Sequence, residues 1–297
     1  MLEHHDQAPT PPERVVVLGA RGFVASNVVG SLDSAGVRVM GLPSAEVDLT
    51  SPSSVDALRS RLRGDDAVVF VSALTPDRGR TVATFMQNLR MGQHVSEALA
   101  ARPCAHVVYI SSDAVYDDEA NPVHERSVCE PSSLHGLMHV VRERMLLETT
   151  RQSGTPLAIL RPTLLYGARD THNGYGPNRF VQQALAGAPI QLFGGGEERR
   201  DHVLVDDVSR LVSLVLAHRS EGVLNIVTGT SVPFARVAEI VVELTGQPVA
   251  IQASPRANPI THRHFDVSAT IAAFPSFACT PLRAGLMSMI EASLRAS

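Results

Sequence analysis

Apolar and polar positions alternate in blocks through the first half of the chain. Short β-branched and apolar runs predict strands, and these runs cover residues 14–18, 37–40, 66–72, 106–110 and 157–161. Between them the apolar positions follow a helical period, as in Val24, Val28 and Leu32 and over residues 82–101 and 133–151. Strands that alternate with helices predict a parallel, doubly wound α/β sheet.

The pattern changes after Gly167. Residues 168–178 are rich in Gly, Asn and Asp, which predicts a binding loop. Shorter helical and strand patterns follow this loop. We therefore predict a first domain over 14–167, to which the chain returns at about 203–228, and a smaller mixed α/β region over 168–297.

The polar, Pro-rich segment 1–13 predicts a disordered tail with its histidines in solvent. A net charge of −4 gives no reason to expect nucleic acid or a membrane surface as partner. The cysteines Cys104, Cys129 and Cys279 lack disulfide or zinc spacing, and reduced thiols predict a soluble, cytoplasmic protein. All 26 basic residues are arginine, so no catalytic ammonium side chain exists.

A glycine-rich turn follows the first predicted strand and opens the first predicted helix. Its pattern is Gly19-x-x-Gly22-x-x-Ala25. Glycines permit the tight turn and the close approach of a pyrophosphate to backbone N–H groups, and a small third residue permits helix–strand packing. This context predicts a Rossmann-type dinucleotide site in the first domain, with the second region binding the substrate.

The cofactor is predicted to be NAD(P), with a preference for NADP. An acidic residue that bonds the ribose is expected about 20 residues after the glycine turn. The stretch 41–44 has no acid, and Arg21 lies within the turn. A guanidinium without a nearby carboxylate favours a 2′-phosphate.

At this point the sequence resembles the extended short-chain dehydrogenase/reductase family of nucleotide-sugar epimerases, dehydratases and ketoreductases, over about residues 14–245. The resemblance implies cofactor contacts from the glycine turn, from the acid–leucine pair Asp48-Leu49 and from the strand end Ser72-Ala73. It also implies a structural asparagine at Asn88 and a substrate-positioning hydroxyl at Ser112. Further similar blocks are Arg161-Pro162, Leu165-Tyr166-Gly167, Arg200-Asp201 and Asp206-Asp207-Val208.

The sequence departs from this family at the catalytic centre. Where the family has Tyr-x-x-x-Lys, this chain has His135 and His139, which share one helix face at i and i+4. His135 can exchange a proton near neutral pH, and His139 can hydrogen-bond a ribose. We predict one proton shared between the two rings, and Tyr116, just past Ser112, is a candidate substitute acid.

Three interpretations of the histidine pair remain open. It could be a substituted dyad for hydride transfer. It could support proton chemistry without net redox, as in an isomerase, lyase or cyclase. The site could also be inactive, which would leave a cofactor-binding or regulatory protein.

The substrate side is predicted from the second region. The loop 170–179 suits a polyhydroxylated or phosphorylated ligand, with Asn178 and Arg179 as contacts. The resemblance implies that Arg200 contacts a nucleotide diphosphate and that two copies form a homodimer. His262 and His264 have a metal-like spacing without a third ligand, so no metal site is predicted.

Overall fold

The computed structural model describes residues 2–170, 173–256 and 259–296. Its main sheet has seven strands in the order β1-β10-β6-β5-β4-β2-β3. The strands are β1 (Glu3–His4), β2 (Arg14–Leu18), β3 (Arg38–Leu42), β4 (Ala67–Phe70), β5 (His106–Ile110), β6 (Leu157–Pro162) and β10 (Ser220–Ile226). All pairs are parallel except β1 with β10.

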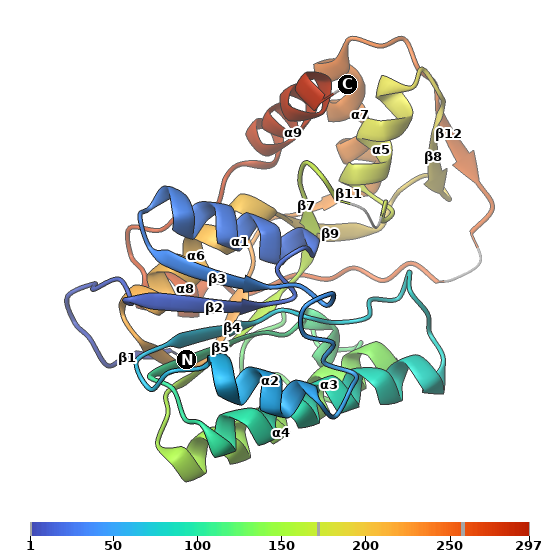
Figure 1. Cartoon of the computed structure of the whole chain (residues 1–297). Helices are drawn as coiled ribbons and strands as arrows, with labels where there is room; N and C mark the ends of the chain where they lie inside the picture. Colours follow the sequence, from blue (N-terminus) through green and yellow to red (C-terminus); the bar gives the residue numbers. More distant parts are fainter. Residues whose placement is uncertain (1, 171–172, 257–258, 297) are drawn as a thin grey trace.

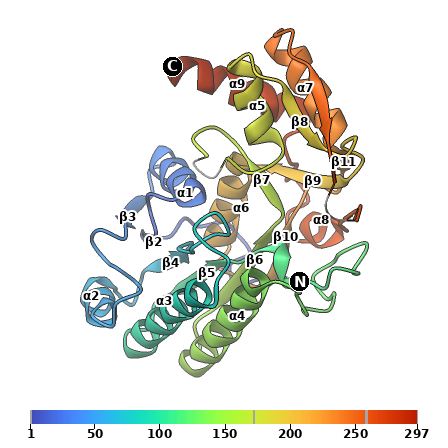
Figure 2. The same ribbon diagram turned by 90° about the vertical axis from the view of Figure 1, so that its right-hand side faces the viewer.

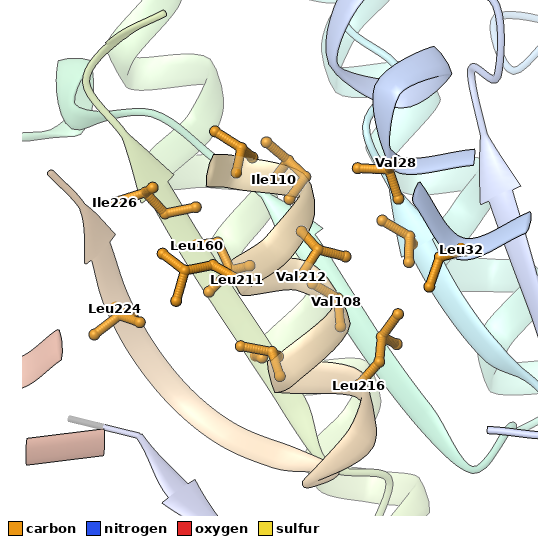
Figure 3. Close-up of a cluster of buried hydrophobic side chains, with 14 of the residues drawn as sticks. Val28, Leu32, Val108, Ile110, Leu160, Leu211, Val212, Leu216, Leu224 and Ile226 are labelled. Atoms are coloured by element: carbon orange, nitrogen blue, oxygen red, sulfur yellow. The ribbon is translucent and has the colours of Figure 1, made fainter. Parts of the chain in front are cut away.

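Helices cover both faces of this sheet, which explains why its central strands are continuous apolar runs. One face carries α1 (Phe23–Ser34) and α6 (Val205–Ala217), and the other carries α2 (Ser54–Arg61), α3 (Val82–Ala101) and α4 (Leu134–Ser153) (Figure 1). Each layer of helices packs a hydrophobic core against the sheet. Figure 3 shows the core under α1 and α6, where Leu211 and Leu216 of α6 and Val28 of α1 pack toward Val108 of β5. The predicted doubly wound fold is therefore confirmed.

The order of the strands creates a crevice above β2 and β4. From β2 the chain builds outward first to β3 and then, in the opposite direction, to β4 and β5. In open α/β sheets ligands bind at this switch point, beyond the carboxyl ends of the strands. The glycine turn lies there, between β2 and α1.

A smaller region sits over the carboxyl edge of the sheet (Figures 1 and 2). A three-stranded sheet has the order β11-β9-β7, and a second pair joins β12 to β8. These strands are β7 (Leu164–Tyr166), β8 (Ile190–Phe193), β9 (Arg199–Leu204), β11 (Ser231–Pro233) and β12 (Ile251–Ser254). The remaining helices are η1 (Asp113–Val115, a 3₁₀ turn), α5 (Pro177–Leu185), α7 (Phe234–Thr245), α8 (Ser268–Ala273) and α9 (Leu282–Ala296).

The N-terminal segment does not form the predicted tail. Glu3 and His4 pair with the edge strand β10, opposite Glu221 and Ser220. The His4 ring bonds the Ser220 hydroxyl (2.8 Å) and the Ala273 carbonyl oxygen (2.9 Å). These partners lie more than two hundred residues away, so local composition gave no sign of them. Among the described residues, no helix is long and apolar enough to cross a membrane.

Candidate active site

A cavity of about 400 Å³ lies at the switch point, and we call it the nucleotide cleft after the cofactor that the sequence predicts there. It is lined by seven of the predicted cofactor residues, namely Gly19, Arg21, Gly22, Asp48, Leu49, Ser72 and Ala73. The eighth, Ala25, is fully buried and packs α1 onto the sheet. Segments that follow three separate strands, β2, β3 and β4, thus meet around one cavity.

The glycine turn is shaped by two close approaches. Gly19 has φ +88°, and a Cβ there would lie 2.4 Å from Oγ of Ser72. Gly22 is the N-cap of α1, and no side chain hydrogen-bonds to the first amides of this helix. These free N–H groups at the positive end of the helix dipole can bind an anionic pyrophosphate.

Asp48 and Arg21 differ in how they are held. The Asp48 carboxylate accepts hydrogen bonds from the Thr50 hydroxyl (2.7 Å) and the Thr50 backbone N–H (2.9 Å), and these bonds lower its pKa. Arg21 has no hydrogen-bond or ion-pair partner in the described part of the chain. Its guanidinium is available to a ligand.

The strand end after β5 is brought against the start of α4. Ser112 caps η1 by accepting from the Ala114 N–H (3.1 Å), and Ser133 caps α4 by accepting from the Gly136 N–H (3.1 Å). A Cβ at Gly136 would lie 2.0 Å from the Ala114 carbonyl oxygen. Only glycine therefore permits this contact, which places His135 beside the end of β5.

His135 lines a cavity of about 200 Å³ together with Arg80 and Asn88. Leu74 lines both this cavity and the nucleotide cleft, so the two adjoin. Burial lowers the pKa of His135, and the positive charges of Arg142 and Arg80 lower it further. At neutral pH His135 is therefore a neutral imidazole, which can accept a proton.

His139 is buried one turn further along α4. Its ring meets that of His135 edge to face, with centroids 4.8 Å apart, and its Nδ1 lies 2.7 Å from the Tyr109 hydroxyl oxygen. Burial first, then His135 and Arg142, lower its pKa well below the usual value. The shared proton predicted for the pair is thus not supported, because both rings are neutral.

Tyr116 does not reach the candidate site. It is 1% exposed, donates to Oδ1 of Asn225 (2.7 Å) and accepts from Arg161 (2.9 Å). Burial raises its pKa to about 12. The turn η1 directs this ring into the interior, so the proposal that Tyr116 is a substitute acid was wrong.

Two residues at the site escaped the sequence reasoning. From the sequence pattern, Tyr109 in the apolar run of β5 is expected to be a core residue, and Arg142 is expected to be an ordinary polar residue of α4. Arg142 is fully buried and donates to the backbone oxygens of Ser72 and Asn88, both at 2.8 Å. No local pattern predicts these contacts, since they join α4 to the loop after β4 and to α3.

Asn88 has the structural role that the resemblance implies. Its side-chain oxygen accepts from the Leu74 N–H (2.8 Å), and its amide donates to the Leu74 carbonyl oxygen (2.9 Å). These two bonds hold the loop after β4, which borders both cavities.

The predicted substrate contacts are engaged within the protein. Asn178 accepts from the Gly167 N–H (3.0 Å) and donates to Asp170, so it shapes the loop rather than facing a ligand. Arg200 donates to Thr261 and forms an ion pair with Glu198. A diphosphate would have to replace these partners.

Arg179 and His262 are also hydrogen-bonded within the protein. Arg179 is half-buried and donates only to the Asn173 carbonyl oxygen (3.2 and 3.3 Å) among the described residues. In the pair His262 and His264, for which no metal site is predicted, Nδ1 of His262 accepts from the Arg199 N–H (3.2 Å). The predicted loop 170–179 also contains 171–172, which lie outside the described residues.

Comparison with known proteins extends these observations. Residues 15–227 match the NAD dependent epimerase/dehydratase family. MoeE5 in complex with UDP-glucose and NAD is 26% identical, with 95% of this chain and 99% of that chain covered and a TM-score of 0.81. The UDP-glucose 4-epimerase of Thermus thermophilus in complex with NAD is 22% identical over 96% and 100% of the two chains, with a TM-score of 0.84.

A third similar structure is the GDP-L-fucose synthetase of Naegleria fowleri bound to NADP. It is 16% identical over 98% of this chain and 96% of that chain, with a TM-score of 0.86. At this identity the similarity concerns the fold alone. The similar structures thus hold either of the two nicotinamide cofactors.

Proposed function

Because the chain belongs to the NAD-dependent epimerase/dehydratase family, we propose that it is an NAD(P)-dependent oxidoreductase or epimerase of a nucleotide-linked sugar, with His135 as its proton-transfer group. The observation that carries this proposal is the position of His135. It lines a cavity that adjoins the nucleotide cleft, at the helix position where the family resemblance places a tyrosine. The substrate class is supported by MoeE5, whose complexes contain UDP-glucose or UDP-glucuronic acid.

The residues of the cleft fit a nicotinamide dinucleotide. The space beside Gly19 in the glycine turn exists only because this residue has no Cβ. The N-terminal amides of α1, which have no side-chain cap, suit a pyrophosphate. Asp48, Leu49, Ser72 and Ala73 border the same cavity and would hold the rest of the molecule. When bound, the oxidised nicotinamide supplies a hydride acceptor.

The proton chemistry belongs to the chain itself. The Ser112 hydroxyl orients the substrate hydroxyl at the end of β5. Neutral His135 accepts the hydroxyl proton as the carbon–hydrogen bond breaks and the carbonyl forms, so the ring becomes an imidazolium. The same imidazolium returns the proton to the oxygen when the carbonyl is reduced again, and the epimer results where the new carbon–hydrogen bond forms on the opposite face. His139 would orient the ribose of a bound cofactor.

The test is turnover of UDP-glucose and UDP-glucuronic acid with NAD⁺ or NADP⁺. We expect His135→Gln to lower kcat by about a hundredfold, because general acid–base catalysis contributes roughly 10²–10⁴ in rate. His124→Gln, the same change at an exposed histidine in a turn, is the control.

Other outcomes would favour the alternatives. Isomerisation without transient reduced nicotinamide would favour a non-redox isomerase, lyase or cyclase. Cofactor binding without turnover of any sugar nucleotide would favour a cofactor-binding or regulatory protein. Unchanged turnover by His135→Gln would contradict the assignment of His135.

We propose NADP as the preferred cofactor, and this rests on Arg21. Its guanidinium borders the cleft without a partner among the described residues, and Ser44 borders the cleft where the resemblance places the acid. Fluorescence titration should show tighter binding of NADPH than of NADH, and Arg21→Gln should remove the difference. Arg63→Gln, at an exposed position outside the cleft, is the control. Tighter NADH binding by the natural chain would contradict the preference.

We also propose a homodimer formed through α3 and α4. These two helices pack side by side and expose large apolar side chains, namely Val82, Met86, Leu134, Leu137 and Leu147. Light scattering should give twice the chain mass, and Met86→Glu should lower it; a monomer in the natural chain would contradict the proposal. The cytoplasmic location stays a prediction.

A further inference from the structure

Arg142 is a buried cation that faces neutral acceptors. Its guanidinium donates to the backbone oxygens of Ser72 and Asn88, contacts Oδ1 of Asn88 at 3.2 Å, and lies 5.0 Å from the centre of the Phe70 ring. No carboxylate forms an ion pair with it in the described ranges. A buried charge without a counter-ion is expensive, and this one lies directly beneath a strand end that lines the nucleotide cleft.

Tyr109 is the hydrogen-bond partner of His139. The Tyr109 hydroxyl is buried, and its oxygen lies 2.7 Å from Nδ1 of His139. A buried hydroxyl proton without an acceptor is costly, and Nδ1 is the acceptor at hydrogen-bonding distance. The Tyr109 proton is therefore directed to Nδ1, and His139 carries its own ring proton on Nε2.

The other charged groups around the pair do not oppose Arg142. Arg80 approaches His135 from the loop before α3 and has the same sign. The nearest carboxylate on α4, that of Glu143, accepts two hydrogen bonds from Arg161 (2.9 and 2.6 Å) and one from Ser111 (2.6 Å). The Glu143 carboxylate is thus already paired with Arg161, and the charges that act on the two imidazoles include those of Arg142 and Arg80.

We propose that Tyr109 and Arg142 together replace the lysine that this chain lacks: Tyr109 is a positioning residue that fixes His139 as a neutral Nε2–H donor, and Arg142, which follows His139 by three residues and His135 by seven on α4, supplies a fixed positive charge that acts together with burial to keep both imidazoles unprotonated until turnover. The assignment rests on the proposed function for its catalytic meaning. In that setting the charge makes His135 ready to accept a proton, and it makes the resulting imidazolium a strong acid that returns the proton.

The first test reads the tautomer of His139 directly. Nitrogen-15 NMR of the full chain should show the Nε2–H form of His139, without titration around neutral pH. Tyr109→Phe keeps the ring and removes the hydroxyl, so we expect both tautomers and a kcat about tenfold lower at unchanged KM, since one hydrogen bond of about 1.4 kcal/mol corresponds to a factor of ten. Tyr116→Phe removes another buried tyrosine hydroxyl and should leave the His139 signals unchanged.

The second test measures the effect of the Arg142 charge on the titration of His135. Arg142→Met should move the midpoint of the His135 NMR titration upward, and with it the acidic limb of the kcat/KM profile, whereas Arg142→Lys keeps the charge and should keep both. If Arg142→Met fails to fold, Arg142→Gln, which keeps a hydrogen-bond donor but removes the charge, should give the same upward shift of the His135 titration.

The outcomes separate this assignment from the proposed function. An unchanged His139 tautomer in Tyr109→Phe, or an unchanged His135 titration in Arg142→Met, would overturn it. The expected NMR changes in a chain that turns over no sugar nucleotide would support the assignment and contradict the proposed function alone.

Discussion

The backbone oxygen of Ala114 occupies the space that a side chain at Gly136 would need. A Cβ at Gly136 would lie 2.0 Å from this oxygen and 2.6 Å from Cβ of Pro131. The first turn of α4 can therefore lie against η1 only because residue 136 is glycine. This contact fixes where His135 stands relative to the end of β5.

We expect Gly136→Ala to displace the first turn of α4 and to lower kcat/KM at least as much as His135→Gln. The melting temperature should also fall, because backbone atoms must move. Gly30→Ala in α1 is the matched control, since a Cβ there has nothing within 4 Å. That change should stabilise the chain by about 0.5–1 kcal/mol, the usual gain in a helix interior. Equal effects of the two substitutions would contradict the close contact.

A second glycine pair tests the cofactor turn. Gly19→Ala combines φ +88° with a Cβ 2.4 Å from the Ser72 hydroxyl, so we expect dinucleotide affinity to fall by at least about tenfold. Gly36→Ala has φ +76° but nothing within 4 Å of its Cβ. It should cost backbone strain of about 1 kcal/mol and leave affinity unchanged. Calorimetric titration with NADH and NADPH measures the dinucleotide affinity of both variants. An affinity of the Gly19 variant equal to that of the natural chain would show that the glycine turn is not part of the binding site.

The ion pair between Glu143 and Arg161 should be a large contributor to stability. Both side chains are 6% exposed, and the shortest contact between them is 2.6 Å. Removing one partner leaves a buried unpaired charge, so Glu143→Gln should lower the free energy of unfolding by roughly 3 kcal/mol. Glu148→Gln breaks the exposed pair with Arg151 on the same helix and should leave the free energy of unfolding nearly unchanged, because solvent screens such a pair. Urea unfolding measures the free energy of unfolding of both variants. Similar losses of stability in Glu143→Gln and Glu148→Gln would contradict the argument that burial makes the first pair more important.

Acid should weaken the fold through its buried histidines. Burial lowers the pKa of His106 to about 4, against an ordinary value of 6.5. Between these values the unfolded chain binds the proton and the folded chain does not, so stability is fully present above pH 6.5 and falls until about pH 4. The loss assigned to His106 is on the order of 3 kcal/mol. His202, whose pKa burial lowers to about 3, acts in the same direction.

The matched pair for this pH effect is His106→Gln against His124→Gln. Glutamine at 106 can still donate to the Ser220 carbonyl oxygen, which His106 contacts at 2.8 Å, but it does not titrate. Thermal unfolding between pH 7 and pH 4 should be less steep in the first variant and unchanged in the second, where the histidine is exposed. An identical slope in both would show that His106 is protonated in the fold.

The elements that the sequence predicts best are those whose cause is local. The strand over His106–Ile110 and the helix over Val82–Ala101 have the predicted bounds, because each has its own periodicity and ends. The glycine turn is equally local. Tyr116 was misplaced because a single 3₁₀ turn sets the direction of its ring, and Arg142 was missed because its partners come from two other elements. Contacts of this kind follow from packing and not from spacing.

The short strand at Glu3–His4 has a consequence for handling the protein. It pairs with β10, which would otherwise end the sheet with unpaired peptide groups. An unprotected sheet margin is a template for joining other chains. A version trimmed before Arg14 would therefore be prone to self-association at high concentration, and an affinity tag is better fused at the opposite terminus.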